Sequence, residues 1–211
     1  MAAIHPDAGA RSPKREAIER SVLLATETLL EEGSSWSELS IERITGRAGI
    51  SRTAFYFYFR DKRDLLMRLA EEAAALLYSE AEGWWSSAGD GRADLPKALD
   101  RVIGLYLEHG TVLRTVSEAA TYDEPVATFW RALVGRFIQA TSERIEREQA
   151  AGRANPGPTQ AIAFTLVWCT ERACYQQLAQ GGPLETDALR EALAVVWLGA
   201  IYGCGAGEGP A

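Results

Sequence analysis

The chain has 211 residues, of which 47% are hydrophobic and 24% charged, a composition typical of a globular protein with a substantial core. Its longest apolar stretches, residues 161–167 and 192–202, are too short to span a membrane, and residues 1–11 lack the apolar segment of a signal peptide. The net charge of −7 is unevenly spread: residues 1–63 hold 10 basic and 9 acidic side chains, residues 64–211 hold 12 and 20. We expect a cytoplasmic protein with no membrane partner, whose N-terminal part can still bind phosphate locally.

The N-terminal third predicts a small helical domain at residues 13–61, after a disordered arm at residues 1–12. A helix at residues 14–32 follows Pro13 and ends at Gly33, as helices often do. Short helices at residues 41–48 and 52–58 each follow a serine that can cap them. A long helix at residues 62–85 comes next.

The remainder reads as an all-α domain at residues 62–203, because no stretch alternates as a strand does. After a polar loop at residues 86–94, helices are expected at residues 95–108, 111–121, 124–151, 159–180 and 184–202. The Asn155-Pro156-Gly157-Pro158 sequence separates the third from the fourth. Residues 204–211 read as a flexible tail.

The two short helices have the construction of a helix-turn-helix. Gly49 makes the turn between them, and Ile50 can fill the angle that they form. On the second helix, Phe55 and Phe59 lie four residues apart and are expected in the core. The residues expected on the opposite side, which would face the DNA major groove, are Arg52, Thr53, Tyr56 and Phe57.

This segment resembles the TetR family of transcriptional regulators. The likeness rests on Trp36, Ser40-Ile41, Ile44, Ala48-Gly49-Ile50-Ser51, the run from Phe55 to Phe59, Lys62 and Leu65. The resemblance implies that Ser40, Tyr56 and Lys62 contact phosphates of double-stranded operator DNA, whereas Arg52 and Thr53 reach base edges. Tyr58 is a weaker candidate for a DNA contact.

Five of the six tryptophans lie beyond residue 83, mixed with isolated hydroxyl groups. Trp130, Phe137 and Thr141 share one helical face, and Thr170 stands alone in an apolar helix. Core packing is one interpretation of this pattern. The other is an apolar cavity with a few polar anchors, which is typical of a small-molecule site.

The C-terminal pattern is similar to the ethionamide-resistance repressor (EthR) branch of the family, through Trp130, Phe137, Thr141, Thr170-Glu171-Arg172 and Val196-Trp197 followed by Ala200-Ile201-Tyr202-Gly203. The resemblance implies an aromatic tunnel for a lipophilic effector. Its expected lining residues are Tyr106, Trp130, Phe137, Thr141, Val167, Thr170 and Trp197. Thr170 stands where the branch has an asparagine, so the ligand preference is expected to differ.

The last two predicted helices are apolar on more than one face. In the final one, Leu189, Leu193, Val196 and Ala200 form one stripe, while Val195, Leu198 and Tyr202 lie off it. A helix that is apolar all round is covered on both sides. A homodimer built on a four-helix bundle would cover them, and a pair buried inside a monomer is the alternative.

Other classes of protein fit less well. The chain has two histidines and none of the motifs of hydrolases, zinc proteases or phosphate-binding loops, so we expect no enzyme and no cofactor. The three cysteines, Cys169, Cys174 and Cys204, lack the paired spacing of a zinc site, so no metal is expected. The sequence thus predicts a ligand-responsive regulator, most simply a repressor, that binds a palindromic operator as a dimer. An all-helical lipid-binding or structural protein that does not bind DNA is the alternative.

Overall fold

The computed structural model describes residues 13–203, and all regular structure within that range is helical. The expected arm at residues 1–12 and tail at residues 204–211 lie outside the described residues. The chain divides into two compact units after Leu69, inside a long helix. Within the described range, none of the helices combines the length and apolar character needed to cross a bilayer.

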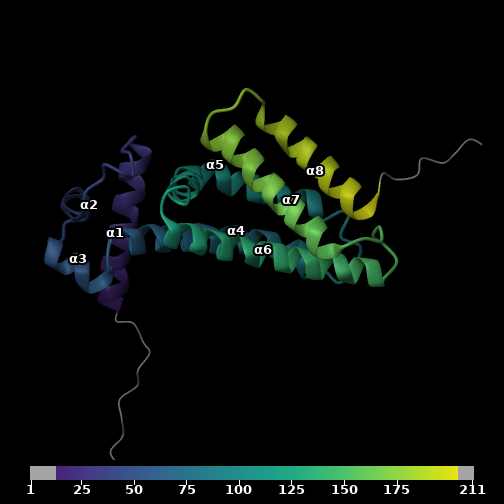
Figure 1. Ribbon diagram of the computed structural model, residues 1–211, viewed down its shortest axis with the longest axis horizontal. Coiled ribbons are helices and arrows are strands. Elements are labelled where there is room, and N and C mark those ends of the chain that lie inside the picture. Colours follow the sequence, from purple (N-terminus) through teal and green to yellow (C-terminus); the bar gives the residue numbers. More distant parts are fainter. Residues whose placement is uncertain (1–12, 204–211) are drawn as a thin grey trace, which may run out of the picture. The chain divides into compact units, whose positions relative to one another are not determined.

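The first unit contains α1 (Pro13–Glu31), α2 (Ile41–Ala48), α3 (Arg52–Tyr58) and the beginning of α4 (Lys62–Trp85) (Figure 1). Local hydrogen bonds determine where the short helices begin: Ser40 Oγ accepts from the Arg43 amide at 3.2 Å, and Ser51 Oγ from the Ala54 amide at 3.1 Å. Gly49 ends α2 with φ of +69°, a conformation that glycine adopts without steric cost. The expected boundaries of α2, α3 and α4 are confirmed.

The second unit contains the rest of α4 and the helices α5 (Leu95–Ala119), α6 (Glu124–Ala150), α7 (Thr159–Cys174) and α8 (Thr186–Tyr202). A π-helical turn, η1 (Tyr175–Ala179), extends α7. α6 packs against α7, and α8 packs against both α5 and α7. These contacts leave a space between the helices that becomes the cavity described below.

Two expectations about these helices are wrong. Residues 95–119 form one helix, not two, because the apolar face on both sides of Gly110 is buried, through Ile103, Tyr106, Val112 and Leu113. Packing of that face exceeds the cost of roughly 1 kcal/mol for a glycine inside a helix. The helix expected at residues 159–180 is regular only to Cys174 and then widens into η1.

Candidate functional site

The first candidate site is the helix-turn-helix formed by α2 and α3. Phe55 and Phe59 are buried and stack with ring centroids 5.2 Å apart, as expected of core residues. The Ile50 amide donates to the Thr45 carbonyl at 3.0 Å, which closes the turn around Gly49. α3 is therefore held firmly on one side and leaves its other side free.

The free side of α3 carries the residues expected to face DNA. Arg52, Thr53, Tyr56 and Phe57 are all exposed, and the Phe57 side chain is 74% exposed although it is apolar. Arg52 forms an ion pair with Glu42 of α2, and its guanidinium lies 5.9 Å from the Tyr56 ring. A hydrogen bond with Tyr56, and then the charge of Glu42, raise the pKa of Arg52, which therefore stays cationic.

Two of the expected DNA contacts are only half exposed. Lys62 Nζ donates to the Leu39 carbonyl at 2.9 Å and to the Trp36 carbonyl, and it lies 4.6 Å from the centre of the Trp36 ring. Burial lowers the pKa of Lys62. The Tyr58 ring is covered by the Arg15 guanidinium at 5.5 Å. Lys62 thus holds the loop before α2 in addition to any contact with phosphate.

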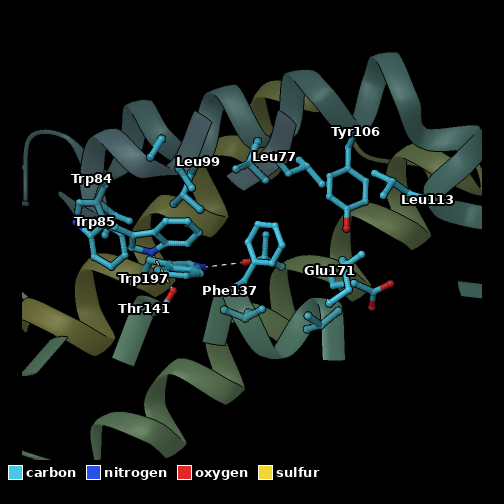
Figure 2. A pocket seen from close by; sticks show the side chains of 18 of the residues that line it. Leu77, Trp84, Trp85, Leu99, Tyr106, Leu113, Phe137, Thr141, Glu171 and Trp197 are labelled. Atoms are coloured by element: carbon cyan, nitrogen blue, oxygen red, sulfur yellow. Dashed lines mark hydrogen bonds between the residues drawn. The ribbon is translucent and has the colours of Figure 1, made fainter. Parts of the chain in front are cut away.

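The second candidate site is an apolar cavity of about 90 Å³ inside the second unit (Figure 2). By volume about six to nine water molecules would fit, since each needs about 10–15 Å³. All seven residues expected from the sequence line it: Tyr106, Trp130, Phe137, Thr141, Val167, Thr170 and Trp197. The remaining lining residues were not predicted: Leu77, Ala81, Trp84, Trp85, Leu95, Ala98, Leu99, Val102, Leu113, Leu133, Val134 and Glu171.

The lining residues that α4 contributes were not among those predicted from the sequence. Leu77, Ala81, Trp84 and Trp85 recur at helical spacing along its last three turns, which was the available signal. Their pattern alone could not distinguish a cavity wall from ordinary core packing. The rings themselves pack edge to face: Trp84 lies 5.8 Å from Trp197.

The hydroxyl groups of both cavity threonines accept hydrogen bonds from tryptophan side chains. The Trp85 indole donates to Thr141 Oγ1 at 3.2 Å, and the Trp197 indole donates to Thr170 Oγ1 at 2.8 Å. The Thr170 hydroxyl also donates to the Leu166 carbonyl at 2.9 Å. These hydroxyls, expected as ligand anchors, therefore first fix the orientation of two aromatic walls.

The opposite end of the cavity carries Tyr106 and Glu171 (Figure 2). Glu171 is only 6% exposed, and burial raises the pKa of its carboxyl group. Burial also raises the pKa of the Tyr106 phenol well above its ordinary value, and that of the nearby Cys174 thiol to about 12. Neither of these two groups ionises near neutral pH.

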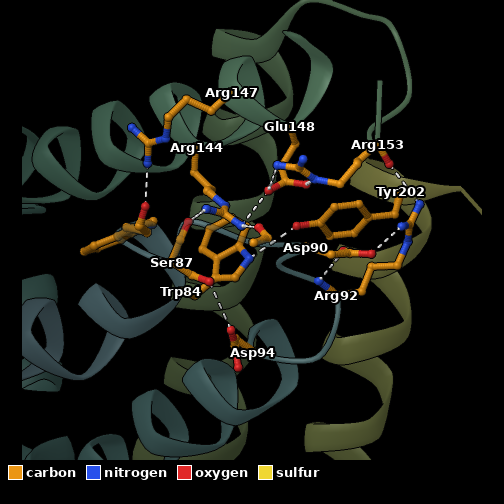
Figure 3. Close-up of polar contacts among 12 residues, drawn as sticks. Trp84, Ser87, Asp90, Arg92, Asp94, Arg144, Arg147, Glu148, Arg153 and Tyr202 are labelled. Carbon is orange, nitrogen blue, oxygen red and sulfur yellow. Dashed lines mark hydrogen bonds and ion pairs between the residues drawn. The ribbon is translucent and has the colours of Figure 1, made fainter. Parts of the chain in front are cut away.

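A buried polar network supports the tryptophan end of the cavity (Figure 3). Arg144 donates to the Gly89 carbonyl at 2.8 Å and forms an ion pair with Glu148, which is fully buried. Arg153 bonds to the same carboxylate at 2.9 Å, and Arg147 donates to the Trp85 carbonyl. The loop after α4 is thereby tied to α6.

Within residues 13–203, no three histidine, cysteine or acidic side chains are grouped so that they could hold a metal ion. Cys169 is exposed and Cys174 is buried, and neither is in a disulfide, while Cys204 lies outside the described range.

The chain matches two descriptions of known families. Residues 23–69 match "Bacterial regulatory proteins, tetR family", and residues 95–203 match "Transcriptional regulator EthR, C-terminal domain". It is 30% identical over 203 residues to the HTH-type transcriptional regulator EthR of Mycolicibacterium smegmatis, covering 92% of each chain. The chain belongs to the TetR family. It is of the EthR type, and therefore a transcriptional regulator that binds DNA and not an enzyme.

A second EthR resembles the chain in sequence, and two solved structures share its fold. EthR of Mycobacterium tuberculosis is 27% identical over 198 residues, covering 90% of each chain. A putative TetR-family regulator from Syntrophomonas wolfei has the same fold, with a TM-score of 0.76 at 18% identity over 87% of this chain and 94% of that one. The fatty acid degradation regulator FadR of Bacillus halodurans superimposes with a TM-score of 0.73 at 15% identity, over 90% and 97% of the two chains.

Proposed function

We propose that this TetR-family regulator is a repressor that binds a palindromic operator as a dimer and is released by a lipophilic small molecule. The single observation that carries the proposal is the position of α4. This continuous helix begins with Lys62, beside the helix-turn-helix, and its last turns provide Trp84 and Trp85 to the cavity wall. A ligand that displaces those turns would act directly on the helix that leads to the DNA-binding unit.

In the proposed DNA complex, Arg52 and Thr53 read base edges, and Ser40, Tyr56 and Lys62 hold phosphates. All of these side chains except Lys62 are exposed, which supports these roles. Arg52 is paired with Glu42, so base recognition requires it to exchange a carboxylate for guanine acceptors, its usual partners in the major groove. Tyr58 is the weaker contact, because Arg15 covers its ring.

The proposed dimer forms through α7 and α8. Both helices expose large apolar side chains, Phe164 on α7 and Val195 and Val196 on α8. Val196 and Ala200, expected on one stripe with Leu189 and Leu193, lie instead on this exposed side, while Leu189 and Leu193 are buried. Two such helices from each subunit would bury these exposed apolar side chains in a four-helix bundle.

The operator is released if the ligand binds the DNA-incompetent state of the dimer more tightly than the DNA-competent state. A ligand with equal affinity for both states would not shift the equilibrium between them. Displacement of α4 in each subunit would misalign two recognition helices that must enter major grooves about 34 Å apart. A coupling free energy of about 1–3 kcal/mol is typical of such systems.

The test titrates n-octanol into the protein bound to DNA from the region upstream of its own gene. Tryptophan fluorescence and operator release are recorded together, and both should change over the same range of octanol concentration. Val102→Phe, which fills the cavity, should suppress both changes yet retain operator binding. Leu107→Phe, on the exposed side of the same helix, is the matched control.

Octanol that changes tryptophan fluorescence without releasing the operator would contradict the switch. If the protein binds octanol but does not bind this DNA, the proposed operator upstream of its own gene would be wrong.

A further inference from the structure

A carboxyl group without a full set of partners lies in the wall of the apolar cavity. Glu171 is 6% exposed, and its Oε2 atom has no hydrogen-bond donor among residues 13–203. Its Oε1 atom receives one long hydrogen bond, 3.4 Å from Ser117 Oγ. Buried polar groups are normally hydrogen-bonded, so an unpartnered one in a binding cavity suggests that a ligand provides the missing donor.

The neighbouring charges do not provide it. Arg172 lies 3.7 Å from Glu171 Oε2, beyond hydrogen-bonding distance, and its side chain is 55% exposed. Its guanidinium lies over the Tyr175 ring, 4.6 Å from the centroid. The other titratable groups near the carboxyl are Tyr106 and Cys174, whose pKa values burial raises, so both stay neutral.

The two threonine hydroxyl groups of the cavity differ from the Glu171 carboxyl group because they already have partners. Thr141 accepts from Trp85, and Thr170 accepts from Trp197 while donating to its own helix. The Trp84, Trp85 and Trp197 rings lie at one end of the cavity, whereas Glu171 and Tyr106 lie together at the other end (Figure 2). The cavity therefore has an apolar aromatic end and an acidic end.

We propose that Glu171 binds the protonated amine of a ligand whose apolar body lies against the tryptophan end of the cavity. The inference rests on the proposed function, in that the cavity is taken to be the effector site, and it names the chemical class of the effector.

An ammonium group fits this end of the cavity better than a hydroxyl group. It has three donors, enough for Glu171 Oε2 and the Tyr106 oxygen together. A hydrogen bond between ionised partners is about twice as strong as one between neutral groups, and its strength grows where water is excluded. A ligand carboxylate would bring a second negative charge to the same place, which disfavours it.

The experiment compares three probes with the same chain: n-octylamine, n-octanol and n-octanoate. Their binding to the full-length protein is followed by tryptophan fluorescence at neutral pH, where octylamine is protonated. Wild-type protein should bind octylamine at least tenfold more tightly than octanol, and octanoate least tightly.

Glu171→Gln keeps the shape of the side chain and removes its charge. It should abolish the preference for octylamine while changing octanol affinity less than about twofold. Glu108→Gln, an exposed substitution on α5, should behave like wild type.

Equal affinities of wild type for octylamine and octanol would overturn the inference. This comparison uses wild-type protein alone, so it does not depend on whether a variant folds. Loss of octylamine and octanol binding alike in Glu171→Gln would also overturn it, because the carboxyl would then only support the wall. Operator release by octanol without any preference for amine would refute the inference and leave the proposed function intact. A preference for the amine without operator release by any probe would support the role of Glu171 and refute the proposed function.

Discussion

Replacement of Thr170 by valine tests how the cavity wall is held together. Valine has nearly the same shape as threonine but removes the hydroxyl that accepts the Trp197 indole N–H at 2.8 Å. Trp197 and Thr170 are both buried, so the indole would lose its partner without gaining water. A buried donor left without an acceptor costs about 1–3 kcal/mol in the free energy of unfolding. For a chain of this size, that corresponds to a Tm lower by about 2–12 °C.

Thr115→Val is the matched control. Thr115 is 5% exposed, against 7% for Thr170, and its hydroxyl donates to the carbonyl four residues earlier, at 2.7 Å, in the same way. Within the described residues, no indole donates to it. Thermal and urea denaturation should therefore show a larger loss for Thr170→Val than for Thr115→Val, with a change in tryptophan emission only in the first. Equal stabilities of the two variants would refute the role of the indole bond.

Four further results are expected. Burial raises the pKa of Glu171 above its ordinary 4.5, so the folded state holds the carboxyl proton more tightly than the unfolded state. In urea denaturation, wild type should therefore lose stability relative to Glu171→Gln as the pH rises from about 4 through the raised pKa. Gly91→Ala should lower the free energy of unfolding by about 1–3 kcal/mol, because its Cβ would lie 2.5–2.7 Å from Tyr202 Oη, Arg144 Nη2 and Trp84 Nε1. Val195→Arg should give monomers or insoluble protein in sedimentation experiments, since it places a charge in the proposed apolar interface; an unchanged dimer would exclude α8 from that interface. In gel shifts, Arg52→Ala should weaken binding to the operator by about 1–3 kcal/mol and relax the preference at one base pair. Lys62→Ala should weaken binding to all DNA sequences alike and also destabilise the loop at Trp36.

Local sequence alone determined the helix-turn-helix. Ser40, Gly49 and Ser51 act on backbone groups within a few residues of themselves, so the bounds of α2 and α3 could be predicted without any knowledge of packing. Helical spacing also placed Trp130, Phe137 and Thr141 on one face of α6, and in the folded chain that face lines the cavity.

Tertiary structure decided what those patterns could not. Gly110 predicts a break in α5, but long-range burial of the surrounding face keeps the helix continuous. Lys62 reads as a phosphate contact, yet carbonyl groups 23 and 26 residues earlier in the chain hold its ammonium. Glu171 lies on α7 and is enclosed in an apolar cavity because Tyr106 and Leu113 of α5 line the same cavity. In each case the deciding partner is distant in sequence, and only the folded chain brings it within contact distance.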